Sequence, residues 1–91
     1  MEFKKSIIAN CAVNCRTESD AESLLSWADA KGFKWASGSN LKLFGTFWDV
    51  YGPYTCYIIK ESGVELISIR SCDYKNVKVV SFGNALLKDK R

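Results

Sequence analysis

The chain has 91 residues, an apolar fraction of 47%, a charged fraction of 25% and a net charge of +3. This length accommodates one hydrophobic core, so we expect a single domain over residues 1–91, and the composition excludes a disordered chain. No stretch approaches the roughly 18 consecutive apolar residues of a membrane span. Polar residues interrupt the segment after Lys4 and Lys5, unlike a secretion signal, and we therefore expect a cytoplasmic protein.

The positive charge is concentrated at the C-terminus, where residues 88–91 supply +2 of the net +3. We expect residues from about 84 to 91 to form a flexible basic tail. In the remainder, Lys and Arg are interspersed with Asp and Glu, whereas a nucleic-acid-binding domain usually gathers its cations on one face. The charge therefore gives only weak support to a nucleic-acid or nucleotide partner.

The N-terminal part of the sequence predicts a strand followed by a helix. Residues 6–15 alternate in polarity, which is typical of a half-buried strand. Residues 16–32 have helical spacing, with a capping box formed by Ser19 and Glu22 and Gly32 as the left-handed C-cap. The expected buried face of the helix consists of Ala21, Leu24, Leu25 and Ala28.

The next segment is less regular. Residues 33–35 predict a short strand, and the first β-α-β unit permits a parallel pairing of this strand with the first one. Residues 36–40 have the composition of a loop. A further strand around residues 47–51 is plausible, and the pair Gly52-Pro53 would end it.

The C-terminal part predicts more β-structure. Residues 54–60 and 64–70 indicate a β-hairpin with Gly63 in its turn. A turn or one helical turn follows, and residues 77–82 predict the last strand. The expected fold is therefore α+β, with one helix packed on a mainly antiparallel sheet of four to six strands in the order β-α-β-(β)-β-β-β.

Four cysteines and no histidine limit both metal binding and catalysis. On one strand face Cys11 and Cys15 would lie about 13 Å apart, too far for two ligands of one zinc ion or for a disulfide. We expect no metal and no cofactor, and mostly buried, reduced thiols at Cys11, Cys15, Cys56 and Cys72. Because the commonest general base is missing, we expect no enzyme. In an enzyme, Cys15 or Asp49 would be the candidate catalytic residue.

Residues 32–59 hold two of the three Trp, three of the five Phe and three of the four Tyr. Filling the core of a small domain is one explanation. However, neighbours on a strand such as Phe47 and Trp48 point to opposite faces, and a single helix cannot cover both. We therefore expect some of the aromatics to be exposed or to contact another chain. The expected partner-binding residues are Trp35, Trp48, Tyr51, Tyr54, Lys34 and Lys42.

Two uses of such a surface are compatible with the residues. Trp, Tyr and basic residues dominate many protein interfaces, and the diluted charge favours this use. The same aromatics are also suited to stacking the bases of a nucleotide or of single-stranded nucleic acid. Self-association into a homodimer, through an uncovered sheet face or edge strand, is compatible with the same pattern.

Residues 18–40 (ESDAESLLSWADAKGFKWASGSN), Trp48, the segment YTCYII and the closing KVVSF resemble a pattern of small phage- and prophage-encoded proteins. In those proteins an acidic-capped helix runs into a G-[FY]-K-W strand, and a second aromatic strand follows. The resemblance covers roughly residues 8–82, and the many cysteines depart from it. It implies a compact accessory protein that acts in the cytoplasm of an infected bacterium.

The expected function is therefore that of a non-enzymatic, phage-derived interaction protein. It would bind and inhibit a host defence protein, such as a CRISPR-type nuclease, through its aromatic surface. The alternative is a small nucleotide-binding or single-stranded nucleic-acid-binding module that uses the same aromatics as stacking platforms.

Overall fold

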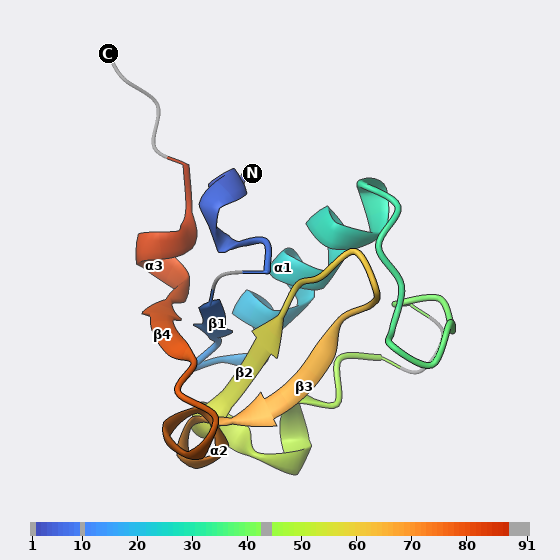
Figure 1. Ribbon diagram of the computed structural model, residues 1–91. Helices are drawn as coiled ribbons and strands as arrows, with labels where there is room; N and C mark the ends of the chain where they lie inside the picture. The colour runs from blue at the N-terminus through green and yellow to red at the C-terminus, as the bar shows by residue number, and fades with distance from the viewer. Residues whose placement is uncertain (1, 10, 43–44, 88–91) are drawn as a thin grey trace.

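A mainly antiparallel sheet lies at the centre of the computed structural model, which describes residues 2–9, 11–42 and 45–87 (Figure 1). These residues form four strands, β1 (Cys11–Asn14), β2 (Thr55–Ile58), β3 (Glu65–Ser68) and β4 (Lys78–Ser81). The strand order is β3-β2-β1-β4. β2 is antiparallel to both of its neighbours, and β1 is parallel to β4. The predicted α+β class, the hairpin and the last strand are confirmed.

The long helix α1 (Glu18–Ala30) follows β1 after a short connection formed by residues 15–17. Its N-cap is Thr17, whose hydroxyl accepts a hydrogen bond from the Asp20 N–H at 3.1 Å. The capping box predicted at Ser19 and Glu22 is therefore wrong, because the helix starts two residues earlier and threonine is also a good cap. The predicted left-handed glycine at the end of the helix is confirmed: Gly32 follows the C-cap residue Lys31, has a φ of +93° and donates its N–H to the Asp29 carbonyl.

One face of the sheet packs on α1. The four predicted helix residues Ala21, Leu24, Leu25 and Ala28 are all buried. They share a core cluster with Cys11, Val13 and Tyr57 from the facing strands. Burial of this apolar surface stabilises the fold by about 25 cal/mol per Å² removed from water.

The other face of the sheet is covered by a second helix, α2 (Ile69–Tyr74), which contradicts the expectation of a single helix. The Ser68 hydroxyl caps it by accepting from the Ser71 N–H at 3.3 Å. Buried Cys72 then packs against Cys56 and the other residues of this second cluster. A helix of six residues is too short to show a helical period in the sequence, so the residues predicted only a turn.

Three predicted strands are shorter than expected or missing. Residues 6–15 contribute only β1, because the chain first forms η1 (Lys5–Ile7) and then turns at Ala9, which has a φ of +65°. The strand predicted at residues 33–35 is reduced to a single bridge between Trp35 and Val64. The parallel neighbour of β1 is β4 rather than this segment.

The strand that was plausible at residues 47–51 is replaced by two short 3-10 turns, η2 (Trp48–Val50) and η3 (Gly52–Tyr54). Left-handed backbone at Phe47, with a φ of +58°, and at Gly52, with a φ of +56°, prevents an extended conformation.

Part of the expected tail is packed on the domain. Residues 82–85 form α3 (Phe82–Ala85), and Ala85 is fully buried. The Ala85 carbonyl accepts from the Lys4 N–H, and the Leu87 N–H donates to the Glu2 carbonyl, both at 2.9 Å. The N-terminal segment therefore lies beside α3, as Figure 1 shows. The rest of the predicted tail, residues 88–91, lies outside the described residues.

Substitution of Gly63 by alanine is expected to destabilise the fold by more than about 2 kcal/mol. Gly63 has a φ of +136°, and a Cβ there would lie 2.4 Å from the Ala36 Cα. This close approach lets Val64 donate to the Lys34 carbonyl at 2.7 Å. Urea unfolding followed by tryptophan fluorescence measures the loss.

The matched control is Gly83→Ala, because a Cβ at Gly83 meets nothing within 4 Å. We expect this variant to change the free energy of unfolding by less than about 1 kcal/mol. Equal unfolding midpoints for the two variants would contradict the tight packing at Gly63.

Candidate functional site

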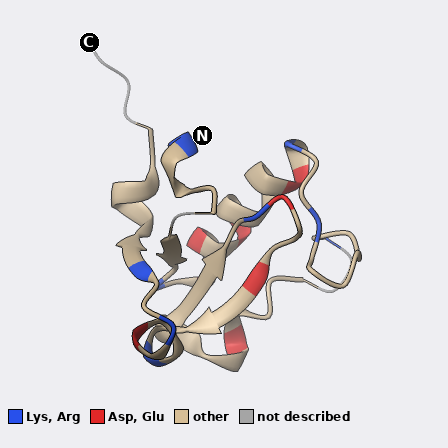
Figure 2. Ribbon diagram, in the orientation of Figure 1, with Lys and Arg blue, Asp and Glu red and all other residues tan. Residues whose placement is uncertain are grey.

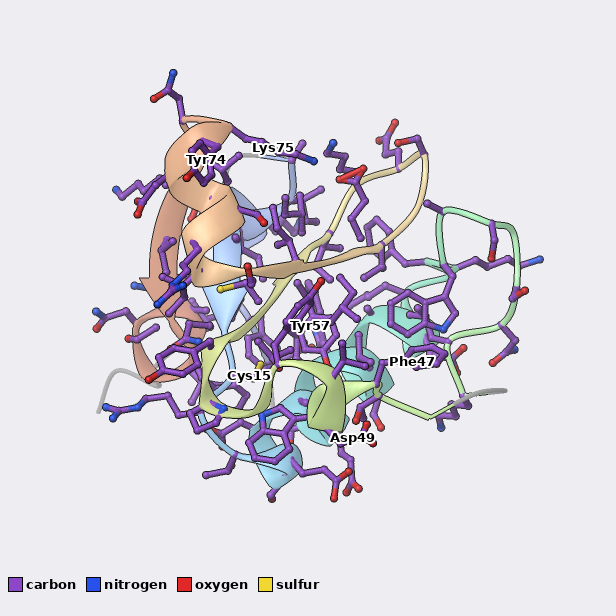
Figure 3. All side chains as sticks on the ribbon, turned by 90° about the horizontal axis from the view of Figure 1, so that it is seen from below. Cys15, Phe47, Asp49, Tyr57, Tyr74 and Lys75 are labelled. Carbon is purple, nitrogen blue, oxygen red and sulfur yellow. The ribbon has the colours of Figure 1, made fainter. Side chains whose placement is uncertain are left out.

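The largest group of exposed aromatic and apolar side chains lies on residues 46–54, which we call the aromatic turn. Seven large hydrophobic residues are exposed in the described part of the chain, and four of them lie on this turn. Their exposed fractions are 38% for Phe47, 57% for Val50, 40% for Tyr51 and 65% for Tyr54. Figure 3 shows the turn on one side of the sheet, with Phe47 and Asp49 on it and Tyr57 toward the interior.

Two buried or half-buried aromatic residues attach the first part of the turn to the core. The Tyr57 hydroxyl donates to the Thr46 carbonyl at 2.6 Å. The Trp48 indole N–H donates to the Cys15 carbonyl at 2.8 Å. The first bond holds the main chain at Thr46, and the second ties the Trp48 side chain to the backbone that follows β1.

Two polar residues of the sheet attach the second part. The buried Asn14 amide donates to the carbonyls of Pro53 and Thr55, each at 3.0 Å. The Thr55 hydroxyl donates to the Trp48 carbonyl at 3.1 Å. The aromatic turn is therefore held at both ends, and its exposed side chains project from a fixed backbone. A surface of this kind loses little conformational entropy when it binds.

A small apolar hollow lies beside the turn. It has a volume of about 370 Å³ and is lined by Trp35, Ala36, Ser37, Phe47, Val64 and Leu66. The rings of Trp35 and Phe47 meet edge to face, with centroids 5.4 Å apart. Phe47 is thus both a wall of the hollow and part of the turn.

Two local features of this hollow cost stability. The left-handed backbone of Phe47 costs on the order of 1 kcal/mol for a bulky residue. The buried indole N–H of Trp35 finds no hydrogen-bond partner among the described residues, a loss of about 1–3 kcal/mol. Strain and unpaired polar groups of this kind cluster at functional sites, and here they lie side by side.

The six predicted binding residues form two groups in the structure. Three of them, Trp48, Tyr51 and Tyr54, lie on the aromatic turn, and the other three, Trp35, Lys34 and Lys42, lie outside it. Tyr51 and Tyr54 are exposed neighbours on the aromatic turn, joined by a backbone hydrogen bond of 3.2 Å. Trp48 is half-buried there, and its indole N–H is used by the fold. Trp35 is buried beside Phe47.

The two predicted lysines are exposed but lie outside the turn. Lys42 is 3.9 Å from the Asp29 carboxylate at the end of α1. Lys34 neighbours Trp35 and offers its carbonyl to Val64.

Sequence reasoning missed Phe47 and Val50 as exposed residues. As part of a strand, one of the neighbours Phe47 and Trp48 would have faced the core. Gly45 and the pair Gly52-Pro53, which flank the segment, are the signal that a turn replaces the strand. Phe44 lies outside the described residues. Tyr74 on α2, at 91% exposure, is also outside the predicted set.

The thiols are buried and protonated rather than reactive. Burial raises the pKa of Cys15, and the nearby Asp20 carboxylate raises it further. Burial, with a smaller contribution from Cys72, raises the pKa of Cys56 to about 12. All four cysteines are free and buried, as predicted. A neutral buried thiol is a poor nucleophile, so Cys15 gains no support as a catalytic residue.

The remaining features bear on catalysis, metal binding and membrane insertion. Asp49, the other candidate catalytic residue, is exposed on the aromatic turn. Within the described residues, no group of three or more Cys, Asp or Glu is arranged to hold a metal ion. None of the helices seen in residues 2–9, 11–42 and 45–87 is long and apolar enough to cross a membrane.

Neither a family model, nor a curated protein, nor a solved structure matches the chain.

Replacing Trp48 by phenylalanine removes one hydrogen bond but keeps an aromatic ring. We expect a loss of about 1–2 kcal/mol in unfolding free energy, because the Cys15 carbonyl loses its donor. We also expect faster amide hydrogen exchange at Val50 and Tyr54, since the turn is then held less firmly.

Trp27→Phe is the matched control for this variant. The Trp27 indole N–H also makes one hydrogen bond, to the Glu2 carboxylate at 2.6 Å, but in another part of the protein. It should lose similar stability without faster exchange in the turn. Unchanged exchange in Trp48→Phe would show that the indole does not hold the turn.

The stability of the protein is expected to fall above about pH 9. Thiols have an ordinary pKa of 9.0, and burial raises that of Cys15 and Cys56 in the folded state. Since their pKa values are raised on folding, the contribution is full below pH 9. It is lost as the pH rises toward the folded value of about 12 for Cys56. The slope approaches about 1.4 kcal/mol per pH unit for each such thiol.

Urea midpoints measured from about pH 7 to about pH 10.5 test this dependence. The variants Cys15→Ala and Cys56→Ala should each show a shallower fall than the parent, whatever their stability at neutral pH. Parallel curves for all three proteins would mean that these thiols do not cause the alkaline loss.

Proposed function

We propose that the protein is a non-enzymatic binding protein that engages a protein partner through the aromatic turn. The observation that carries the proposal is that the side chains of the turn are exposed while its backbone is attached to the core. Phe47, Val50, Tyr51 and Tyr54 are exposed, while hydrogen bonds from the core hold the backbone beneath them. A fold that only needed these side chains for its core would bury them.

The energetics favour the turn as a binding anchor. Tyrosine offers a large apolar area and one hydroxyl with few rotatable bonds, and it is common among the residues that dominate interface energies. Burying most of a tyrosine contributes about 2 kcal/mol or more in such positions. Tyr51 and Tyr54 lie next to each other and can enter adjacent pockets of one partner.

The charge of the turn favours a protein over a nucleic acid. Asp49 is the charged residue within residues 46–54, and it is negative. Single-stranded nucleic acids bind where aromatics are combined with a positively charged groove. The alternative of a nucleotide or single-stranded nucleic-acid module therefore draws less support from this surface.

The proposed partner is a host defence protein, such as a CRISPR-type nuclease, in the cytoplasm of an infected bacterium. This part of the proposal rests on the resemblance of the sequence to small phage-encoded proteins. Occupation of a surface on such a nuclease by the turn would block it without any chemistry. Inhibition by binding requires no catalytic residue in the inhibitor.

The test compares tagged parent protein with the variant Tyr51→Ser/Tyr54→Ser in pull-downs from lysates of bacteria that carry defined defence systems. The parent should retain one such protein in stoichiometric amounts. Its expression should also restore plating of a phage that this system restricts. We expect the double variant to bind at least about 30-fold more weakly, corresponding to about 2 kcal/mol.

Tyr74→Ser is the matched control, because Tyr74 is an exposed tyrosine on α2, away from the turn in Figure 3. It should bind like the parent, and all variants should unfold within about 1 kcal/mol of it. Equal binding by the double variant would overturn the proposed surface. Retention of oligonucleotide that dissociates steeply with salt would support the nucleic-acid alternative instead.

A further inference from the structure

A second hollow lies between the N-terminal segment, the end of α1 and Leu87, which follows α3. It has a volume of about 590 Å³, within the range of about 300–1,000 Å³ that small-molecule sites occupy. The residues that line it are Glu2, Phe3, Lys4, Lys5, Ile8, Trp27, Lys31, Phe33 and Leu87. We call it the lysine-rimmed hollow. No residue of the aromatic turn takes part in it.

The wall of this hollow is apolar. The rings of Phe3 and Trp27 pack with centroids 5.2 Å apart. Phe33 and Ile8 are half-buried, and Leu87 is 58% exposed at the edge. The indole N–H of Trp27 is already bonded to the Glu2 carboxylate. A ligand with many hydrogen-bonding groups would leave them unpaired against this wall, which weakens binding.

The rim of the hollow is positively charged. Three lysines stand against one carboxylate, and Figure 2 shows cations at the start of the chain and at the end of α1. Glu2 is engaged on both oxygens, by the Trp27 N–H at 2.6 Å and by Lys31 at 3.8 Å. Among the ion pairs of the described residues, none involves Lys4 or Lys5. Within the part of the chain that the structure describes, their two ammonium groups can therefore pair with an anion.

We propose that the lysine-rimmed hollow binds a small amphipathic monoanion, namely the carboxylate of a medium-length alkyl chain. The chain lies against Phe3, Trp27 and Phe33, and the carboxylate pairs with Lys4 and Lys5 at the rim. An alkyl chain carries no polar group for the wall to leave unpaired. Its single negative charge complements the two lysines, which have no carboxylate partner among the described residues.

A nucleotide fits this hollow less well, although it is also an anion. Its base and sugar carry several donors and acceptors, and the wall offers the aromatic and aliphatic groups described above. The same reasoning disfavours a neutral lipid, because it would leave the lysine rim without a counter-charge.

The experiment is a titration of the full chain with decanoate at monomeric concentrations, followed by calorimetry and by tryptophan fluorescence. We expect saturable one-to-one binding. Decanol, which has the chain without the charge, should bind at least about tenfold more weakly, since one charge-assisted contact is worth about 1.4 kcal/mol. Acetate and adenosine monophosphate should not compete with decanoate.

The variant Lys4→Ser/Lys5→Ser should weaken decanoate binding at least about tenfold while leaving decanol binding unchanged. The matched control is Lys34→Ser/Lys75→Ser, which removes the same charge from two exposed lysines outside the hollow. The variant Leu87→Ser should weaken both ligands, because it removes apolar wall from an exposed position.

Several results would overturn the proposal. They are the absence of saturable decanoate binding, equal loss in the two double-lysine variants, and tighter binding of adenosine monophosphate than of decanoate. The lysine variants replace exposed side chains, so a parent-like unfolding midpoint is expected and checks that each fold is intact. The titration contains only this protein and a small ligand, so a failure of the proposed protein interaction would not change its result.

Discussion

β1 is buried on both faces and paired along both edges, and β2, β4, η1 and α3 all contact it. Three of its residues, Ala12, Val13 and Asn14, pair with β2 on one side, and all four pair with β4 on the other. Val13 contributes to the core under α1, while Ala12 contributes to the core under α2. Because no position on the strand is free of neighbours, its side chains are small or apolar except for Asn14, whose buried amide is hydrogen-bonded.

The candidate functional site depends on the end of the same strand. The Asn14 side chain and the Cys15 carbonyl each make a hydrogen bond to the aromatic turn. A buried amide is costly when it is unpaired, so Asn14 both needs the turn and holds it. The core therefore determines where Tyr51 and Tyr54 project, although neither side chain belongs to the core.

The elements that could be predicted are those whose signal is local. α1 has a capping residue, an apolar face at helical spacing and a terminal glycine, and the hairpin of β2 and β3 has two β-rich runs around Gly63. Even there the exact cap was missed, since Thr17 and Ser19 are both good N-caps. The choice between them is made by where β1 ends, which is not a local property.

The elements that could not be predicted depend on contacts distant in sequence. α2 forms where Cys72 can pack on the far face of the sheet, and the aromatic turn follows a path set by Asn14 and Tyr57. Trp48 illustrates the difficulty for the site. Its residue type indicated an interface, but its indole N–H donates a hydrogen bond to the carbonyl of Cys15, which lies 33 residues earlier in the chain. Whether an aromatic residue is exposed depends on the tertiary structure. The composition identified the aromatic segment but could not identify which of its residues are exposed.

The two proposed binding surfaces lie near opposite ends of β1. The aromatic turn is attached at Asn14 and Cys15, whereas the lysine-rimmed hollow includes Ile8, just before the strand. A short strand that is hydrogen-bonded on both edges and packed on both faces does not shift by small amounts, because its neighbours would have to move with it. Ligand at the hollow would then change the affinity of the turn only if it altered the population of a second arrangement of the whole sheet. Without such an arrangement the two binding free energies add, as they do for distant sites that share no partner. Binding at one proposed surface then leaves the affinity of the other unchanged.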